Sequence, residues 1–135
     1  MTPTLSRSLE LLEHSAIELA DPAEDTRGRD VRDQVGEHIG RVEDVLVDPT
    51  TNRARMLVVT TDGLLGIGKH RYLVPLAAVR AHDGDALIVD RMRDQVTGGP
   101  EHDDAALDGG DGEQDLYEAV YAWYELQPYW VQPTS

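Results

Sequence analysis

The feature that most constrains the fold is a series of short valine-rich runs in the middle of the chain. Eleven of the thirteen valines lie between Val31 and Val96, and β-branched residues favour the pleated, half-buried surface of a sheet. The apolar runs cover residues 38–39, 42–47, 56–61, 72–74 and 86–89, and turn residues bound them. We therefore predict a small antiparallel sheet or barrel with no long helix between its strands.

The turn residues between these runs indicate how the strands connect. Asp48 and Pro49 suit a tight turn, because the aspartate side chain can cap it and the proline presets φ. We expect this turn to join two adjacent antiparallel strands. Residues 83–85 (Asp-Gly-Asp) suit the last hairpin in the same way, and Pro75 is expected to open a single helical turn that runs to Val79.

The N-terminal flank is predicted to be helical. Leu5, Leu9 and Leu12 form one stripe of an amphipathic helix that begins near Thr2 and ends near His14. This segment would lie outside the valine-rich centre. We therefore treat residues 1–27 as an N-terminal helical extension.

The C-terminal flank holds six of the seven aromatic residues. We predict a helix from residue 113 that Pro128 stops, with two neighbouring apolar stripes. In one interpretation the stripe of Leu116, Val120 and Trp123 covers an open face of the sheet. In the other, the tyrosine stripe also meets a second subunit or a partner, because Tyr and Trp are enriched at interface hot spots. The candidate partner-binding residues are Tyr117, Tyr121, Trp123, Tyr124, Tyr129 and Trp130.

The uneven distribution of charge divides the chain further into segments. The net charge is −14, and residues 96–135 hold nine acidic residues and no basic one. We divide the chain into the extension 1–27, a β domain 28–96, an acidic linker 97–112 and an aromatic helix and tail 113–135. This charge excludes nucleic acid as the main partner. No apolar run is long enough for membrane insertion and no secretory signal opens the sequence, so we expect a cytoplasmic location.

The residues that usually carry chemistry are few or scattered. There is no cysteine, which excludes disulfides, thiolate metal sites and cysteine nucleophiles. The five histidines lack metal-ligand spacing, and the serines lack a nucleophile elbow. We expect no catalytic constellation, no metal site and no cofactor, and therefore a protein that is not an enzyme.

One basic cluster follows a glycine-rich stretch. Residues 63–69 match the G-x-x-x-x-G-K core of a phosphate-binding loop. The Ser or Thr that should follow is absent, and residues 71–75 have the pattern of a strand rather than a helix. We interpret the stretch as a bend between strands. Lys69, His70 and Arg71 remain a weak candidate for binding an anion, an acidic partner or the chain's own acidic tail.

Four segments of the centre together resemble the PRC-barrel domain. They are residues 30–48, 55–59, 63–68 and 72–79, and they run through a glycine, a valine-rich strand ending in Asp48, a glycine-rich bend and a Val-Pro-Leu sequence. This domain is the small β-barrel named from the H subunit of the photosynthetic reaction centre, and it also ends a ribosome-maturation factor. The resemblance covers about residues 28–96. The aromatic tail is similar to that of stand-alone bacterial members.

The resemblance implies a mainly β fold built on a small antiparallel PRC-like barrel. It also implies a non-catalytic adaptor or assembly module that binds a protein partner or a second copy of itself as a homodimer. It transfers no catalytic residue, because the family has no common active site. Two alternatives stay open: a regulator that binds a small anion or ion at residues 63–71, and an electron-transport accessory like the reaction-centre H subunit.

Overall fold

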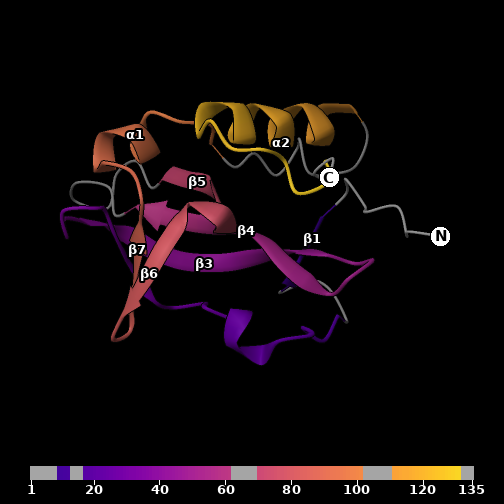
Figure 1. Cartoon of the computed structure of the whole chain (residues 1–135), viewed down its shortest axis with the longest axis horizontal. Helices are drawn as coiled ribbons and strands as arrows, with labels where there is room; N and C mark the ends of the chain where they lie inside the picture. Colours follow the sequence, from indigo (N-terminus) through magenta and orange to yellow (C-terminus); the bar gives the residue numbers. More distant parts are fainter. Residues whose placement is uncertain (1–8, 13–16, 62–69, 102–110, 132–135) are drawn as a thin grey trace.

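The computed structural model describes residues 9–12, 17–61, 70–101 and 111–131 (Figure 1). The protein is mainly β, as the valine pattern predicts. Two of its short helical turns are 3₁₀ helices, labelled η. In chain order the elements are β1 (Glu10–Leu11), η2 (Pro22–Glu24), β2 (Asp30–Arg32), β3 (His38–Asp48), β4 (Arg53–Thr61), β5 (His70–Pro75), η4 (Leu76–Ala78), β6 (Val79–Asp83), β7 (Ala86–Val89), α1 (Arg93–Thr97) and α2 (Asp111–Trp123).

The strands form one curled sheet in the order β5-β4-β3-β2-β7-β6, with β1 beside β3. Neighbours are antiparallel except β2 and β7, which pair in parallel. Within the described residues no pairing joins β5 to β6, so the sheet is an open half-barrel, and the expected small antiparallel barrel is present only in part. Helices, rather than further strand pairing, cover the apolar face that this opening leaves.

β3 is the central strand, and it carries much of the core. Along one edge it pairs with β4, while β2 and β1 share its other edge. Gly40 permits an unusually close approach of β4, because a Cβ at this position would lie 2.2 Å from the carbonyl oxygen of Thr60. The curl of the sheet at this point therefore depends on the absence of a side chain.

The prediction of an N-terminal helix is wrong where the structure describes that segment. Glu10–Leu11 form β1, which pairs with Val47 and Leu46 of β3, and Leu9 is buried. The reason is that the free edge of β3 satisfies the backbone groups of this segment, and such tertiary pairing overrides local helical spacing. Residues 1–8 and 13–16 lie outside the described residues.

The expected turns are present. The Asp48 carboxylate accepts a hydrogen bond from the Thr50 amide at 2.9 Å, and the turn joins antiparallel β3 and β4. The predicted helical turn after Pro75 is η4. Gly84 takes a positive φ of 60° between β6 and β7, a conformation that glycine adopts without strain.

The helices α1 and α2 lie on one side of the sheet, and the segment that contains η2 lies on the other (Figure 1). α1 contacts β3 and β5, and α2 contacts β5. On the other side, the Glu24 carboxylate of η2 accepts two hydrogen bonds from the Arg53 guanidinium of β4, both at 3.0 Å. No helix among the described residues is both long and apolar enough to span a membrane.

Candidate functional site

The aromatic helix α2 lies against the sheet by its tyrosine stripe. Tyr117, Val120, Tyr121 and Tyr124 are buried in the core, whereas Trp123 is 48% exposed. Of the stripe expected to cover the sheet, Val120 is buried and Leu116 is partly buried against the core, so only Trp123 departs from that expectation. The tyrosine stripe, which was considered as a partner surface, is buried. Tyr117, Val120, Tyr121 and Tyr124 lie on one continuous face of the helix, and burying this face removes their apolar surface from water.

α2 begins at Asp111, close to the predicted start, and ends at Trp123, before the predicted stop. The Leu126 amide donates to the Tyr121 carbonyl at 3.0 Å, and the Glu125 amide donates to the Ala122 carbonyl at 3.1 Å. These two bonds form a Schellman motif, in which one residue must be left-handed. Glu125 fills that position with φ 55°. The helix therefore ends through its own backbone bonds, five residues before Pro128.

Arg91 completes the end of α2 from another part of the chain. Its guanidinium donates a hydrogen bond to the Tyr124 carbonyl, and it lies 5.8 Å from the centroid of the Tyr124 ring. A cation at a helix C-terminus complements the partial negative charge of the last carbonyl groups. The segment between β7 and α1 thus holds the C-terminal end of α2 in place.

Trp123 is exposed but fixed in position. Its indole N–H donates a hydrogen bond of 2.6 Å to the Gln95 carbonyl in α1. The ring lies over the turn that follows α1, where a Cβ at Gly99 would come within 2.7 Å of the indole nitrogen. A pocket of about 260 Å³ adjoins the ring, and Arg91, Gln95, Tyr124 and Glu125 line the rest of it.

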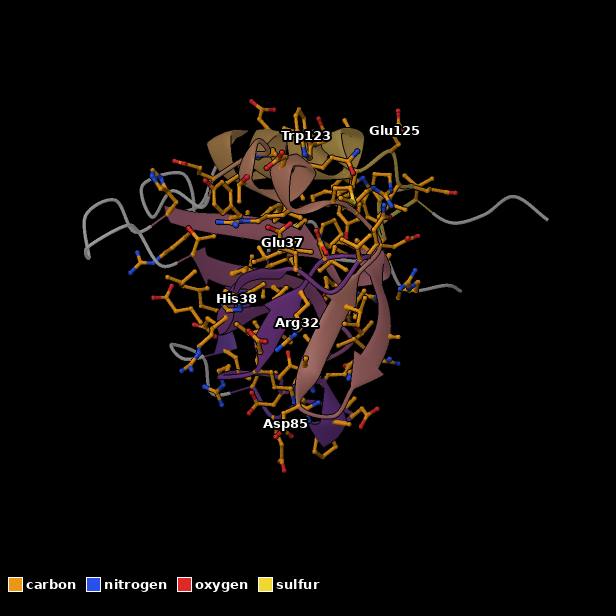
Figure 2. All side chains as sticks on the ribbon, turned by 90° about the vertical axis from the view of Figure 1, so that its left-hand side faces the viewer. Arg32, Glu37, His38, Asp85, Trp123 and Glu125 are labelled. Carbon is orange, nitrogen blue, oxygen red and sulfur yellow. The ribbon has the colours of Figure 1, made fainter. Side chains whose placement is uncertain are left out.

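Figure 2 shows the side of the molecule that extends from α2 to the β6–β7 turn. Trp123 and Glu125 lie at one end of this face, Asp85 lies at the other, and Glu37, His38 and Arg32 lie between them. The acidic end at α2 and the acidic β6–β7 turn are therefore far apart. This separation supplies a control position for any charge change near Trp123.

The last two candidate aromatics pack within the chain. The rings of Tyr129 and Trp130 lie 5.1 Å apart in an edge-on arrangement, and both rings contact Tyr121. Tyr129 also lies under the Arg55 guanidinium of β4. Both side chains are half-buried. The segment after α2 therefore returns to the sheet and adds to the core.

Burial has a clear electrostatic effect on two of the tyrosines. It raises the pKa of Tyr121 to about 12, against the opposing influences of the Arg55 charge and the Tyr129 backbone N–H. Burial also raises the pKa of Tyr124, against the opposing charge of Arg91. The Tyr124 hydroxyl has no hydrogen-bond partner among the described residues. Both phenols are therefore neutral parts of the core at physiological pH.

Asp33 connects the β2–β3 turn to the start of α1. Its carboxylate accepts hydrogen bonds from the amides of Glu37 at 2.8 Å, Val35 at 3.0 Å and Arg93 at 3.1 Å. Burial by itself would raise the pKa of this fully buried side chain, but these backbone donors, together with Gly36, hold it below 3.8. α1, on which the Trp123 ring rests, is thus anchored by a charged aspartate.

The basic cluster does not converge on one point. His70 contacts the Glu101 carboxylate at 2.9 Å, and Arg71 contacts the Glu43 carboxylate at 2.7 Å. Lys69 lies outside the described residues. Glu101 belongs to the segment that we assign to the acidic linker, so His70 contacts an acidic residue of the chain itself. Most of that linker, residues 102–110, lies outside the described residues.

Metal ligation needs several donor side chains that converge on one point. In residues 9–12, 17–61, 70–101 and 111–131, no three His, Asp or Glu side chains are close enough together to hold a metal ion.

Several residues that build this site were not predicted from the sequence. Arg91 and Gln95 carried no signal, because neither belongs to a recognisable motif. Gly98 and Gly99 were assigned to the linker, although a glycine pair is also a common sign of a helix end or of a close approach by another group. The aromatic character of the tail made Trp123 a candidate, but it did not indicate the direction in which the Trp123 side chain points.

The fold and site together define a small β module whose half-barrel sheet is covered on one side by helices. A family model for the PRC-barrel domain matches residues 20–96, which is more than half of the 135 residues. The chain belongs to the PRC-barrel domain family. A comparison with curated proteins gave no significant match.

Proposed function

We propose that this protein is a non-catalytic protein-binding and assembly module that docks its partner at Trp123. The observation that carries the proposal is the state of this side chain, which is half-exposed yet fixed by its hydrogen bond to Gln95 and by its contact with Gly99. A large aromatic side chain that is already ordered loses little conformational entropy on binding. Tryptophan is also among the residues most enriched at interface hot spots.

The other aromatic residues of the tail have a different role in this proposal. Tyr117, Tyr121 and Tyr124 stabilise the core, and Tyr129 and Trp130 attach the tail to it. They support the docking surface from behind and do not themselves contact the partner. The partner-binding residues proposed here therefore reduce to Trp123 and the exposed positions around it.

Site-specific photo-crosslinking in the source cells tests this proposal. A photoreactive residue at Ala122, which is exposed on α2 beside Trp123, should form a protein adduct. The same residue at Asp85, at the far end of the molecule, serves as the matched control (Figure 2). The adduct should disappear when Trp123→Ala is added. Adducts that are the same from both positions, or that persist in the Trp123→Ala chain, would contradict docking at this surface.

A second candidate function is self-association, which the family resemblance implies. The observation that favours it is the open edge of the sheet at β6, which pairs only with β7 among the described residues. An open edge offers backbone groups to a second chain. Sedimentation across a wide concentration range tests this candidate, and a monomer mass at every concentration would remove it.

A further inference from the structure

We propose that the outer face of α2 binds a basic segment of another protein, with a Lys or Arg side chain stacked on the Trp123 indole. This inference rests on the proposed function and adds the chemistry of the partner. We call the surface the Trp123 face. It consists of the exposed residues Asp115, Ala119, Ala122, Trp123 and Glu125.

The charge around the Trp123 face favours a cationic partner. Asp115 and Glu125 lie on the face itself, and Asp94 is exposed on the neighbouring α1. The chain supplies no basic residue after Arg93, whereas nine acidic residues lie in positions 96–135. A surface of one sign attracts ligands of the opposite sign and accelerates their association.

The two basic residues that adjoin the face already have partners. Arg91 donates to the Tyr124 carbonyl and lies over the Tyr124 ring. Arg93 lies 3.5 Å from the Glu37 carboxylate. The ion pairs that these arginines form among the described residues are with Asp90 and Glu37, and not with Asp115 or Glu125. A basic partner would therefore neutralise the carboxylates of Asp115 and Glu125.

The shape of the face suits a long cationic side chain. Ala119 and Ala122 are small and exposed, so the surface of α2 at these positions leaves room for a side chain that lies along the helix. Lys and Arg lay their alkyl stems along apolar surface while the charged end reaches a polar group. A cation over the face of an indole gains further attraction from the ring quadrupole, and tryptophan is the best ring for this contact. Glu125 lines the pocket of about 260 Å³ beside the ring, together with Arg91, and its carboxylate would receive the charged end.

The same charges argue against a second copy of the chain on this face. In a two-fold dimer each residue meets the corresponding surface of the partner. Two Trp123 faces would bring Asp115 and Glu125 of both copies together, and like charges across an interface are strongly disfavoured. A basic heterologous partner avoids this repulsion.

Selection from a library of random displayed peptides tests the inference even though the partner is unidentified. The full chain is the bait, and peptides that also bind the Trp123→Ala chain are discarded. We expect the remaining peptides to be enriched in Lys and Arg. Circular dichroism should first establish that the Trp123→Ala chain is folded.

An enriched peptide is then titrated calorimetrically against three variants. Trp123→Ala should weaken its binding about 10-fold or more. Glu125→Lys, which leaves the core untouched, should weaken it about 5-fold or more. Asp85→Lys makes the same charge change at the far end of the molecule and should alter it by less than about 2-fold at physiological salt (Figure 2).

The outcomes separate this inference from the proposed function. Trp123-dependent peptides that are neutral or acidic would overturn the basic partner while leaving docking at Trp123 in place. Equal weakening by Glu125→Lys and Asp85→Lys would also overturn it, because net charge alone would then explain the affinity. The absence of any Trp123-dependent peptide would overturn both proposals.

Discussion

The Arg55 guanidinium lies 4.9 Å from the centroid of the Tyr129 ring, and this contact connects β4 to the segment that follows α2. The same guanidinium lies 3.9 Å from the carboxylate of Asp48, which is fully buried. Arg55 therefore does two things. It holds the C-terminal segment against the sheet, and it supplies the charge opposite a buried aspartate in the β3–β4 turn.

Replacement of Arg55 should destabilise the protein strongly. Arg55→Ala leaves Asp48 buried without its opposing charge and removes the cation from the Tyr129 ring, so we expect a loss of about 2–3 kcal/mol in the free energy of unfolding. Urea denaturation measures this. Arg41→Ala, an exposed position on β3, is the matched control and should change stability by less than about 0.5 kcal/mol. Similar effects of the two variants would contradict the role of Arg55.

Gly40 should be the glycine least tolerant of a side chain. Gly40→Ala places a Cβ 2.2 Å from the Thr60 carbonyl oxygen, which is backbone and cannot move aside alone. We expect a loss of about 3 kcal/mol or more in the free energy of unfolding. Gly28→Ala, where φ is 87° but no atom lies within 4 Å, should cost about 1 kcal/mol from backbone strain alone. Equal losses would show that the close approach of β4 is unimportant.

The end of α2 offers a stabilising substitution. Glu125 holds the left-handed position of the Schellman motif with φ 55°, which glycine adopts at lower cost. We expect Glu125→Gly to raise the free energy of unfolding by about 1 kcal/mol. Ala122→Gly, three residues earlier within the helix, should lower it by about the same amount. Thermal denaturation of the two variants should therefore move the midpoint in opposite directions.

The lowered pKa of Asp33 predicts that the protein loses stability in acid. Its pKa in the folded protein is lower than 3.8, so its contribution is fully present above the unfolded value and is lost as the pH falls through the folded value. Asp33→Asn should be less stable than the native chain at neutral pH, and the difference should shrink as the pH falls below 3.8. Chemical denaturation at a series of acid pH values measures this. Asp85→Asn, in the exposed β6–β7 turn, makes the same chemical change away from the β2–β3 turn and is the matched control.

The raised pKa values of the buried Tyr121 and Tyr124 predict that the protein loses stability in alkali. The pKa of Tyr121 rises from 10.0 to about 12, so its neutral form contributes fully below pH 10 and the contribution is lost as the pH rises towards 12. Tyr124→Phe should keep or slightly raise stability at neutral pH, because the hydroxyl has no partner among the described residues. Tyr124→Phe should also weaken the alkaline loss. Tyr121→Phe is the contrast, since it removes the acceptor of the Tyr129 backbone N–H.

The strands of the centre could be predicted because each is short, rich in valine and bounded by a turn. β3, β4, β5 and β7 all contain the runs marked out by the sequence. β1 could not be predicted, because Leu5, Leu9 and Leu12 have helical spacing and the free edge of β3 is a property of the folded sheet. The parallel pairing of β2 with β7 was equally hidden, since three residues of β2 carry too little pattern to fix a direction.

The site was harder to predict than the fold. Helical periodicity identified two adjacent stripes on α2, but the direction of each depends on what the sheet and α1 place beneath them. Gln95 and Gly99 decide the position of Trp123, and they lie more than twenty residues away in sequence. The end of α2 likewise depends on Glu125 and Arg91, whereas the sequence pointed to Pro128.

Because Trp123 lies over Gly99 and stays partly exposed, its intrinsic fluorescence can report binding. The indole is partly in water and has a fixed hydrogen bond, so anything that covers it changes the polarity around the ring and therefore the wavelength of its fluorescence. Trp130 is the other source of indole emission in the chain. Trp130→Phe would leave Trp123 as the single indole emitter, at the docking surface that we propose, and unlabelled protein could then report binding there directly.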